Sequence, residues 1–265
     1  MGEVIVVTSG KGGVGKTTTT ANIGAALAGL GKKVVLIDGD TGLRNLDIVM
    51  GLESRVVYNL VDVIEEKCSL NQALIKHKKY QNLFLLPTSQ TKNKNDVKPE
   101  KILTIIDSLK EDFDYVLVDS PAGIEQGFES SVTAADRALI VVNPEVTSIR
   151  DADRVINILW NMGIRDCKLI INRIDYDMVK NGEMLDVEDI INTLDIELIG
   201  IVPSDKSITI SINKGEPIGL DNTSKMGYTF RQIAQRIVGE IIPFNTSNEN
   251  DTGFAHTIKK WFASK

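Results

Sequence analysis

Seven short apolar runs, rich in Val, Ile and Leu, recur along the chain and constrain its fold more than any other feature. None of them alternates apolar and polar residues, so each is predicted to be a strand buried on both faces. Segments with the apolar spacing of helices lie between several of these runs. This order predicts parallel βαβ units, and so an α/β fold with a mostly parallel, twisted sheet and helices on both faces. The runs are 4–8, 34–38, 83–87, 115–119, 138–143, 168–173 and 198–203, and the helical segments are about 17–31, 98–113, 147–162, 186–194 and 224–241.

Composition divides the chain into three parts. The βαβ pattern continues without a repeat or a low-complexity block, so one domain is predicted over 1–242. The stretch "PFNTSNENDTG", 243–253, is polar and is predicted to be a flexible linker. The last segment, 254–265, has a different, amphipathic character.

Charge and cysteine content exclude several classes of protein. The formal net charge is −6, which argues against general electrostatic binding to nucleic acid. Cys68 and Cys167 are far apart, so the chain has no disulfide framework or zinc-finger spacing and suits a reducing cytosol. His77 and His256 stand alone without ligand spacing, and we expect both at the surface. No secretory signal and no apolar window of ~18 residues is present, so we expect no membrane span.

The stretch "GKGGVGKT", 10–17, follows a predicted strand and opens a predicted helix. It fits the phosphate-loop pattern G-x-x-x-x-G-K-[ST], in which backbone N–H groups and a helix N-terminus surround phosphate oxygens. Lys16 is expected to reach the β- and γ-phosphates, and the Thr17 hydroxyl to bind Mg²⁺. A glycine-rich turn unrelated to nucleotides is the alternative. The motif predicts a single-domain P-loop NTPase that uses ATP and Mg²⁺.

Carboxylates follow two of the predicted strands. Asp119 ends the apolar run "YVLVD", where ligands of open α/β sheets bind, and is expected to hold Mg²⁺ as a Walker B acid. A helix cap or a turn is the alternative role for such a residue. Asp38 and Asp40 end the second strand, and one of them is a candidate for orienting the attacking water.

A second lysine in the loop, Lys11, makes the motif unusual. "KGGVGKTT" resembles the deviant Walker A ATPase family, and "DGDTGLRNLDIVMGLE", "DSPAGIE", "NPEVTSIRDADR" and "GEPI" extend a resemblance to its cell-division members to about residue 220. The resemblance implies that Lys11 reaches across a homodimer to the nucleotide of the partner. Its alternative is a solvated loop lysine.

The resemblance also implies roles for other residues. Asp40 is expected to position the hydrolytic water, Asp119 to be the Walker B acid, and Asp38 to support them. Asn172 is expected to contact adenine, with Pro203 and Asp205 beside the base. The implied nucleotide-binding residues are Gly10, Lys11, Gly12, Gly13, Val14, Gly15, Lys16, Thr17, Thr18, Asn172, Pro203 and Asp205, and the implied catalytic residues are Lys11, Lys16, Asp40 and Asp119.

The C-terminal segment "FAHTIKKWFASK" has a helical apolar stripe opposite lysines. This pattern is typical of an interfacial helix on anionic lipid, and docking on the protein's own core is the alternative. We expect the protein in the cytoplasm and, reversibly, on the inner face of the cytoplasmic membrane. The expected lipid-contacting residues are Phe254, Ile258, Lys259, Lys260, Trp261 and Phe262.

The function implied is an ATPase that dimerises with ATP, hydrolyses it slowly without an activating partner, and regulates placement of the division septum. Implied partners are a division inhibitor, an activating or positioning protein and an anionic membrane, with no nucleic acid. The alternative is a DNA- or cargo-segregation ATPase of the same family, which needs a basic surface and no amphipathic tail. A metabolic phosphate-loop ligase is a further alternative, whereas an electron-transfer member is excluded by the missing cluster cysteines.

Overall fold

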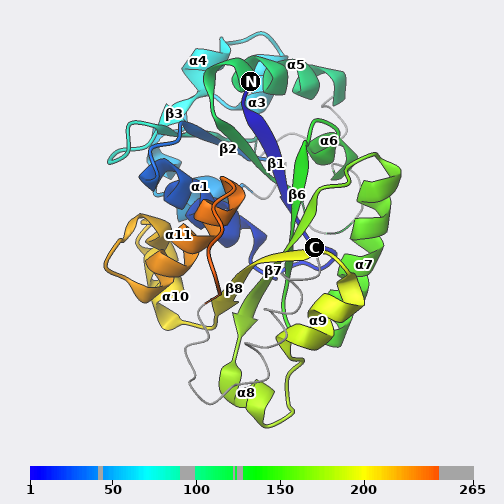
Figure 1. Ribbon diagram of the computed structural model, residues 1–265. Helices are drawn as coiled ribbons and strands as arrows, with labels where there is room; N and C mark the ends of the chain where they lie inside the picture. The colour runs from blue at the N-terminus through cyan, green and yellow to red at the C-terminus, as the bar shows by residue number, and fades with distance from the viewer. Residues whose placement is uncertain (41–43, 90–98, 122, 124–127, 245–265) are drawn as a thin grey trace.

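The computed structural model describes residues 1–40, 44–89, 99–121, 123 and 128–244. Eight strands form one sheet in the order β3-β4-β2-β5-β1-β6-β7-β8 (Figure 1). Every neighbouring pair is parallel except β3 and β4, which are antiparallel. The strands are β1 Glu3–Thr8, β2 Val34–Asp38, β3 Ile75–Lys76, β4 Leu83–Leu86, β5 Tyr115–Asp119, β6 Arg137–Val142, β7 Cys167–Ile174 and β8 Glu197–Pro203.

Helices cover both faces of this sheet, because successive strand residues point to opposite sides. Val4 and Val6 pack with residues of α5, α7 and α9, whereas Ile5 and Val7 pack with residues of α1 and α11. Figure 1 shows α1, α10 and α11 on one side and α7 and α9 on the other. The helices are α1 Lys16–Gly29, α2 Leu46–Val49, α3 Leu60–Ile64, α4 Leu70–Ala73, α5 Pro99–Asp112, α6 Phe128–Val132, α7 Val146–Asn161, α8 Tyr176–Lys180, α9 Val187–Leu194, α10 Lys206–Asn213 and α11 Lys225–Ile237, with 3₁₀ turns at Glu53–Arg55 and Ile218–Leu220.

Local sequence explains where several of these helices begin. The Asn59 side chain accepts N–H groups at the start of α3, and Asp62 completes a capping box there. Ser224 caps α11 and Asp186 caps α9 in the same way. Helix α1 is buried along most of its length between the sheet and α11, and its Ala, Gly and Thr residues are small enough for this close packing.

The predicted fold class is confirmed: all seven predicted strands and all five predicted helical segments are present. Several elements were not predicted from the sequence: β3 and the short helices α2, α3, α4, α6, α8 and α10. The last helix was predicted to extend to 241, whereas α11 ends at Ile237. None of the helices in the described ranges is both long enough and apolar enough to cross a bilayer.

The end of the described chain is held against the domain. The Arg236 guanidinium donates to the carbonyl oxygens of Ile199, Ile242 and Pro243, at 3.0, 2.9 and 3.1 Å, and lies 3.8 Å from the centre of the Phe244 ring. Two residues of the predicted linker therefore pack on the domain. The rest of the linker and the predicted lipid-contacting helix, 254–265, lie outside the described residues, and the domain boundaries remain predictions.

Candidate nucleotide-binding site

The phosphate loop joins β1 to α1 and lies against two other elements. Gly15 has a left-handed backbone (φ 98°), and a Cβ there would lie 2.4 Å from Nδ2 of Asn172 on β7. A Cβ on Gly10 would lie 2.3 Å from the Asp151 backbone on α7. Both positions therefore require glycine. Gly15 is required for its left-handed backbone and for its contact with Asn172, and Gly10 only for the close approach of the α7 backbone.

Lys16 begins α1 and is buried below the loop, with 7% of its surface exposed. Its Nζ donates to Ser9 Oγ at 3.1 Å, and Ser9 Oγ donates to the Lys11 carbonyl at 2.8 Å. Burial lowers the pKa of Lys16, and the charges of Asp119 and Asp40 act in the opposite direction. A desolvated ammonium group that donates a hydrogen bond to a neutral hydroxyl is well suited to bind a phosphate oxygen instead.

Asp38 and Asp119 lie side by side at the ends of β2 and β5, as the strand register requires. Both are almost fully buried, at 1% and 2% exposure. Burial, followed by the charge of Asp38, raises the pKa of Asp119 to about 7, although bonds from Thr17 and Thr20 oppose the shift. The Thr20 hydroxyl donates to Asp119 Oδ1 at 3.2 Å.

The pKa of Asp38 is raised to about 6, again chiefly by burial. Its carboxylate accepts the backbone N–H groups of Asp40 at 3.0 Å and of Asn45 and Leu46 at 3.2 Å each, which moderate the shift. The carboxylate therefore holds the backbone that follows β2 and the start of α2. This structural role of Asp38 was not predicted from the sequence.

The carboxyl pair fits a divalent cation. The ionised forms of two adjacent buried carboxyl groups with raised pKa values would be stabilised by a nearby cation. Among the residues that the structure describes, no group of three or more His, Cys, Asp or Glu is arranged to hold a metal ion. Mg²⁺ is ordinarily held by one or two carboxylates together with nucleotide phosphates, so the pair and the neighbouring Thr17 hydroxyl are a suitable donor set.

Lys11 faces its own chain. Its Nζ donates to Glu145 Oε2 at 2.7 Å and to Thr147 Oγ1 at 3.1 Å, at the start of α7. The side chains of Lys11 and Glu145 are 40% and 51% exposed, so this ion pair is weak and exchangeable. The predicted reach of Lys11 into a partner's site remains a prediction.

The residues expected around the base lie at the ends of β7 and β8. Nδ2 of Asn172 donates to the Val14 carbonyl at 2.7 Å, so this amide fixes the phosphate loop. Pro203 ends β8, and Asp205 caps α10 by accepting Ser207 N–H at 2.7 Å. The adenine contacts of these residues remain predictions.

Sequence reasoning missed Ser9, Thr20 and Glu145, which contact the predicted site residues. Ser9 precedes the loop and is the only one of the three with a local signal. Thr20 and Glu145 reach their partners across 99 and 134 positions, and no sequence pattern links such positions.

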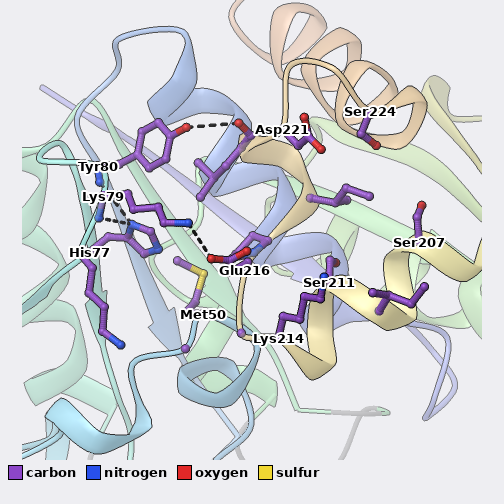
Figure 2. Close-up of a pocket in the computed structure, with 17 residues that line it drawn as sticks. Met50, His77, Lys79, Tyr80, Ser207, Ser211, Lys214, Glu216, Asp221 and Ser224 are labelled. Carbon is purple, nitrogen blue, oxygen red and sulfur yellow. Dashed lines mark hydrogen bonds and ion pairs between the residues drawn. The ribbon is translucent and has the colours of Figure 1, made fainter.

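A pocket of about 580 Å³ lies elsewhere, between the turn after β3, the end of α2, α10 and the 215–221 segment (Figure 2). None of the predicted site residues lines it. Figure 2 shows the ion pair between Lys79 and Glu216 in this pocket, with a distance of 2.6 Å.

The predicted surface position of His77 is wrong. Its side chain is 6% exposed, and its Nδ1 accepts hydrogen bonds from the backbone N–H groups of Lys79 and Tyr80. The buried ring thus closes a turn. His256 lies outside the described residues.

The parallel sheet, the phosphate loop and the buried carboxyl pair define a P-loop ATPase. Residues 2–171 match the family model of an AAA domain. The chain is 48% identical to septum site-determining protein MinD of Bacillus subtilis, with 99% of this chain and 98% of that protein covered. The chain belongs to the septum site-determining MinD family of cell-division ATPases, which confirms the predicted ATPase activity with ATP and Mg²⁺.

Solved structures agree with this assignment. MinD in the MinC:MinD cell division protein complex of Aquifex aeolicus has a TM-score of 0.86 and 52% identity, covering 92% of this chain and 98% of that one. A MinD complexed with Mg-ADP from Pyrococcus horikoshii has a TM-score of 0.81 and 30% identity, covering 89% and 96%. A ParA family ATPase from Chlorobium tepidum has a TM-score of 0.73 at 21% identity, covering 88% and 99%, and so shares the fold alone. The DNA-segregation alternative is therefore less well supported.

Proposed function

We propose that this ATPase dimerises when it binds ATP, attaches to the cytoplasmic membrane as a dimer, and there regulates placement of the division septum. The observation that supports the ATP-dependent step is the buried Lys16 at the start of α1, whose charge acts on Asp119. Asp119 lies beside Asp38 at the carboxyl ends of the adjacent strands β5 and β2. The relative solved as a MinC:MinD complex supports MinC as the division inhibitor that binds this chain. MinE, or an equivalent positioning protein, is the proposed activator.

Lys16 and the loop hold the nucleotide in this proposal. The backbone N–H groups of the loop and the N-terminus of α1 face the phosphates, and Lys16 exchanges its bond with Ser9 Oγ for a phosphate oxygen. Thr17 and Asp119 would hold Mg²⁺, which would supply positive charge to the phosphates.

Asp40 is proposed to orient the attacking water. Asp38 supports it, because its carboxylate accepts the Asp40 N–H and so fixes the backbone that carries the Asp40 side chain. Phosphoryl transfer depends on positioning and on charge stabilisation. Hydrolysis is therefore expected to be slow until an activating partner completes the alignment.

Lys11 connects ATP binding to dimerisation in this proposal. Its exposed bond to Glu145 is replaceable, so Lys11 is available to the phosphates in a partner's site. Lys11→Ala is expected to keep ATP binding by the monomer and to lose the ATP-dependent dimer, as measured by nucleotide titration and light scattering. Lys16→Ala is expected to lose both. A Lys11→Ala protein that still dimerises with ATP would place Lys11 in its own site.

The proposed membrane attachment relies on the C-terminal segment 254–265. A helix of about 12 residues is marginal in water, so the segment is expected to fold on lipid and to bind weakly as a single copy. Two copies on one dimer gain effective concentration, which raises avidity by about 10²–10⁴. ATP then controls attachment by controlling dimerisation.

Sedimentation with anionic vesicles tests this function directly. The full chain is expected to sediment with ATP and to stay in solution with ADP, and a chain truncated after Gly253 is expected to stay in solution with both. Equal sedimentation in ATP and ADP would contradict the dimer switch, and binding that survives truncation would remove the role of the tail. A gel shift with DNA tests the segregation alternative, for which ATP-dependent DNA binding is expected.

A further inference from the structure

Two asparagines, Asn143 and Asn172, lie on neighbouring strands beside the phosphate loop. Val142 at the end of β6 pairs with Ile171 of β7, and each asparagine directly follows one member of this pair. Both asparagines are buried, at 8% and 6% exposure. A buried amide side chain ordinarily satisfies other polar groups, so the partners of Asn143 indicate its task.

The groups around Asn143 determine how its amide is oriented. With the nitrogen toward the loop, Nδ2 lies 3.2 Å from the Val14 carbonyl oxygen and 3.3 Å from the Asn172 carbonyl oxygen, and donates to both. The opposite orientation would bring the nitrogen toward the exposed Glu145 side chain and would set the amide oxygen against these two carbonyl oxygens. Because oxygens without a hydrogen between them repel, and an exposed carboxylate has water as a partner, the nitrogen faces the loop.

The Val14 carbonyl oxygen therefore accepts two amide donors. Asn172 Nδ2 donates to it at 2.7 Å and Asn143 Nδ2 at 3.2 Å, so both of its acceptor positions are used. None of the described peptide bonds is cis, so the N–H of the Val14–Gly15 peptide points away from this carbonyl oxygen. The asparagines thus hold one side of the peptide and direct the Gly15 N–H to the other side.

Gly15 is held at its carbonyl end as well. Its carbonyl oxygen accepts the Thr19 N–H at 2.9 Å in the first turn of α1. A Cβ on Gly15 would lie 2.4 Å from Asn172 Nδ2, so the amide approaches the loop as closely as a glycine allows. Asn143 in turn is fixed to α7, because its own N–H donates to Ser148 Oγ at 3.1 Å. The direction of the Gly15 N–H is therefore set before a ligand binds.

We propose that Asn143 is a positioning residue for the nucleotide: together with Asn172 it fixes the Val14–Gly15 peptide so that the Gly15 N–H faces the phosphates. A donor that is already aimed loses little conformational freedom when the anion arrives, which favours binding. The inference rests on the proposed function, because it requires the phosphate loop to bind the nucleotide. Backbone N–H groups of such loops surround the α- and β-phosphates, which ATP and ADP share. The amide of Asn143 is therefore expected to strengthen the binding of both nucleotides equally.

The test measures the dissociation constants of ATP and ADP with Mg²⁺, by calorimetric titration of the full chain at a temperature where each variant is folded. Asn143→Leu keeps most of the side-chain volume and removes the donor, and Asn143→Ala removes both. Each is expected to raise both dissociation constants about fivefold, the effect of one neutral hydrogen bond. Wild-type affinity in Asn143→Leu would show that the side chain only fills space, and would overturn the proposal. An effect on ATP alone would place Asn143 at the γ-phosphate and would overturn it too.

Ser148→Ala is the matched control, because it removes the partner of the Asn143 backbone N–H and leaves the side-chain amide in place. It removes a buried hydroxyl, so its thermal midpoint is expected to fall, while both dissociation constants stay within about twofold of the wild type. If Ser148→Ala weakens the binding of both nucleotides as much as Asn143→Leu, Asn143 has only a structural role and the inference is wrong.

ATPase kinetics separate positioning from catalysis. When hydrolysis is slow, KM follows the dissociation constant, so Asn143→Leu is expected to raise KM about fivefold and to leave kcat per folded molecule near the wild-type value. A lowered kcat with an unchanged dissociation constant would place Asn143 in the hydrolytic step and overturn the inference. A wild-type protein that does not bind ADP, or a Lys16→Ala protein that binds it as the wild type does, would instead contradict the proposed function.

Discussion

Asp119 shows how burial sets the chemistry of a single residue. Its carboxyl group is 2% exposed beside Asp38, and its pKa rises from 3.8 to about 7. The folded protein therefore binds a proton that the unfolded chain releases between these two values. The stability that this proton contributes is complete below about pH 4 and is lost as the pH rises toward 7.

Asp119→Asn is expected to flatten this pH dependence. A rise in the carboxyl pKa from 3.8 to about 7 corresponds to about 4 kcal/mol at most, at 1.36 kcal/mol per tenfold change in proton affinity. Urea unfolding of the nucleotide-free protein at pH 5 and pH 8 measures the effect. The unfolding free energy of the wild type is expected to fall between pH 5 and pH 8, and that of Asp119→Asn is expected to fall much less. Identical pH dependence in both proteins would contradict the raised pKa.

Single residues were predictable where a local motif defines them. Lys16 was predicted from a loop pattern and Asp119 from a strand end, and the structure places the two close together beside the phosphate loop. The bond between Lys11 and Glu145 joins residues 134 positions apart, so it depends on the packing of α7 against the loop. His77 was misplaced for a related reason, because an isolated histidine gives no sign of the turn N–H groups that bury it.

At the scale of elements, the length of a strand or helix determined whether it could be predicted from the sequence. The strands buried on both faces are continuous apolar runs, so periodicity alone identifies them. β3 has two residues, and α2 and α4 have four each, which is too short for a periodic signal. These short elements form because the larger ones hold their ends: the carboxylate of Asp38, at the end of β2, accepts the N–H groups of Asn45 and Leu46 at the start of α2.

Helix α11 gives a prediction at this scale. Arg236→Ala removes three donors to backbone carbonyls and the contact with Phe244, so a loss of about 2–3 kcal/mol in unfolding free energy is expected. Arg236→Lys is expected to recover little, since an ammonium group cannot reproduce the planar fork. Urea unfolding measures both, with Arg231→Ala on the same helix as the control. Equal effects at the two arginines would show that the carbonyl contacts contribute nothing specific.

At the scale of the whole molecule, one end of the sheet carries the candidate nucleotide site, and we expect the other end to contribute stability. The candidate site residues lie at the carboxyl ends of β1, β2 and β5, where ligands bind in open α/β sheets generally. At the opposite end, Arg137 pairs with Glu3 at 3.1 Å and with Asp166 at 2.7 Å, and Lys168 pairs with Asp166 and Glu197 at 3.0 and 2.6 Å. This ion-pair network joins β1, β6, β7 and β8 far from the phosphate loop.

Arg137→Ala is therefore expected to change stability and leave catalysis unchanged. It leaves Glu3 without this cation and Asp166 with Lys168 alone, and it removes a bond to the Ile237 carbonyl. Because these groups are half-buried and form a network, a loss of about 1–3 kcal/mol is expected. The ATPase kcat/KM per folded molecule should stay at the wild-type value, whereas Asp119→Asn should lose ATPase activity without losing stability at pH 8. If Arg137→Ala lowers kcat/KM at temperatures where it is fully folded, the two ends of the sheet are coupled and the division of tasks is wrong.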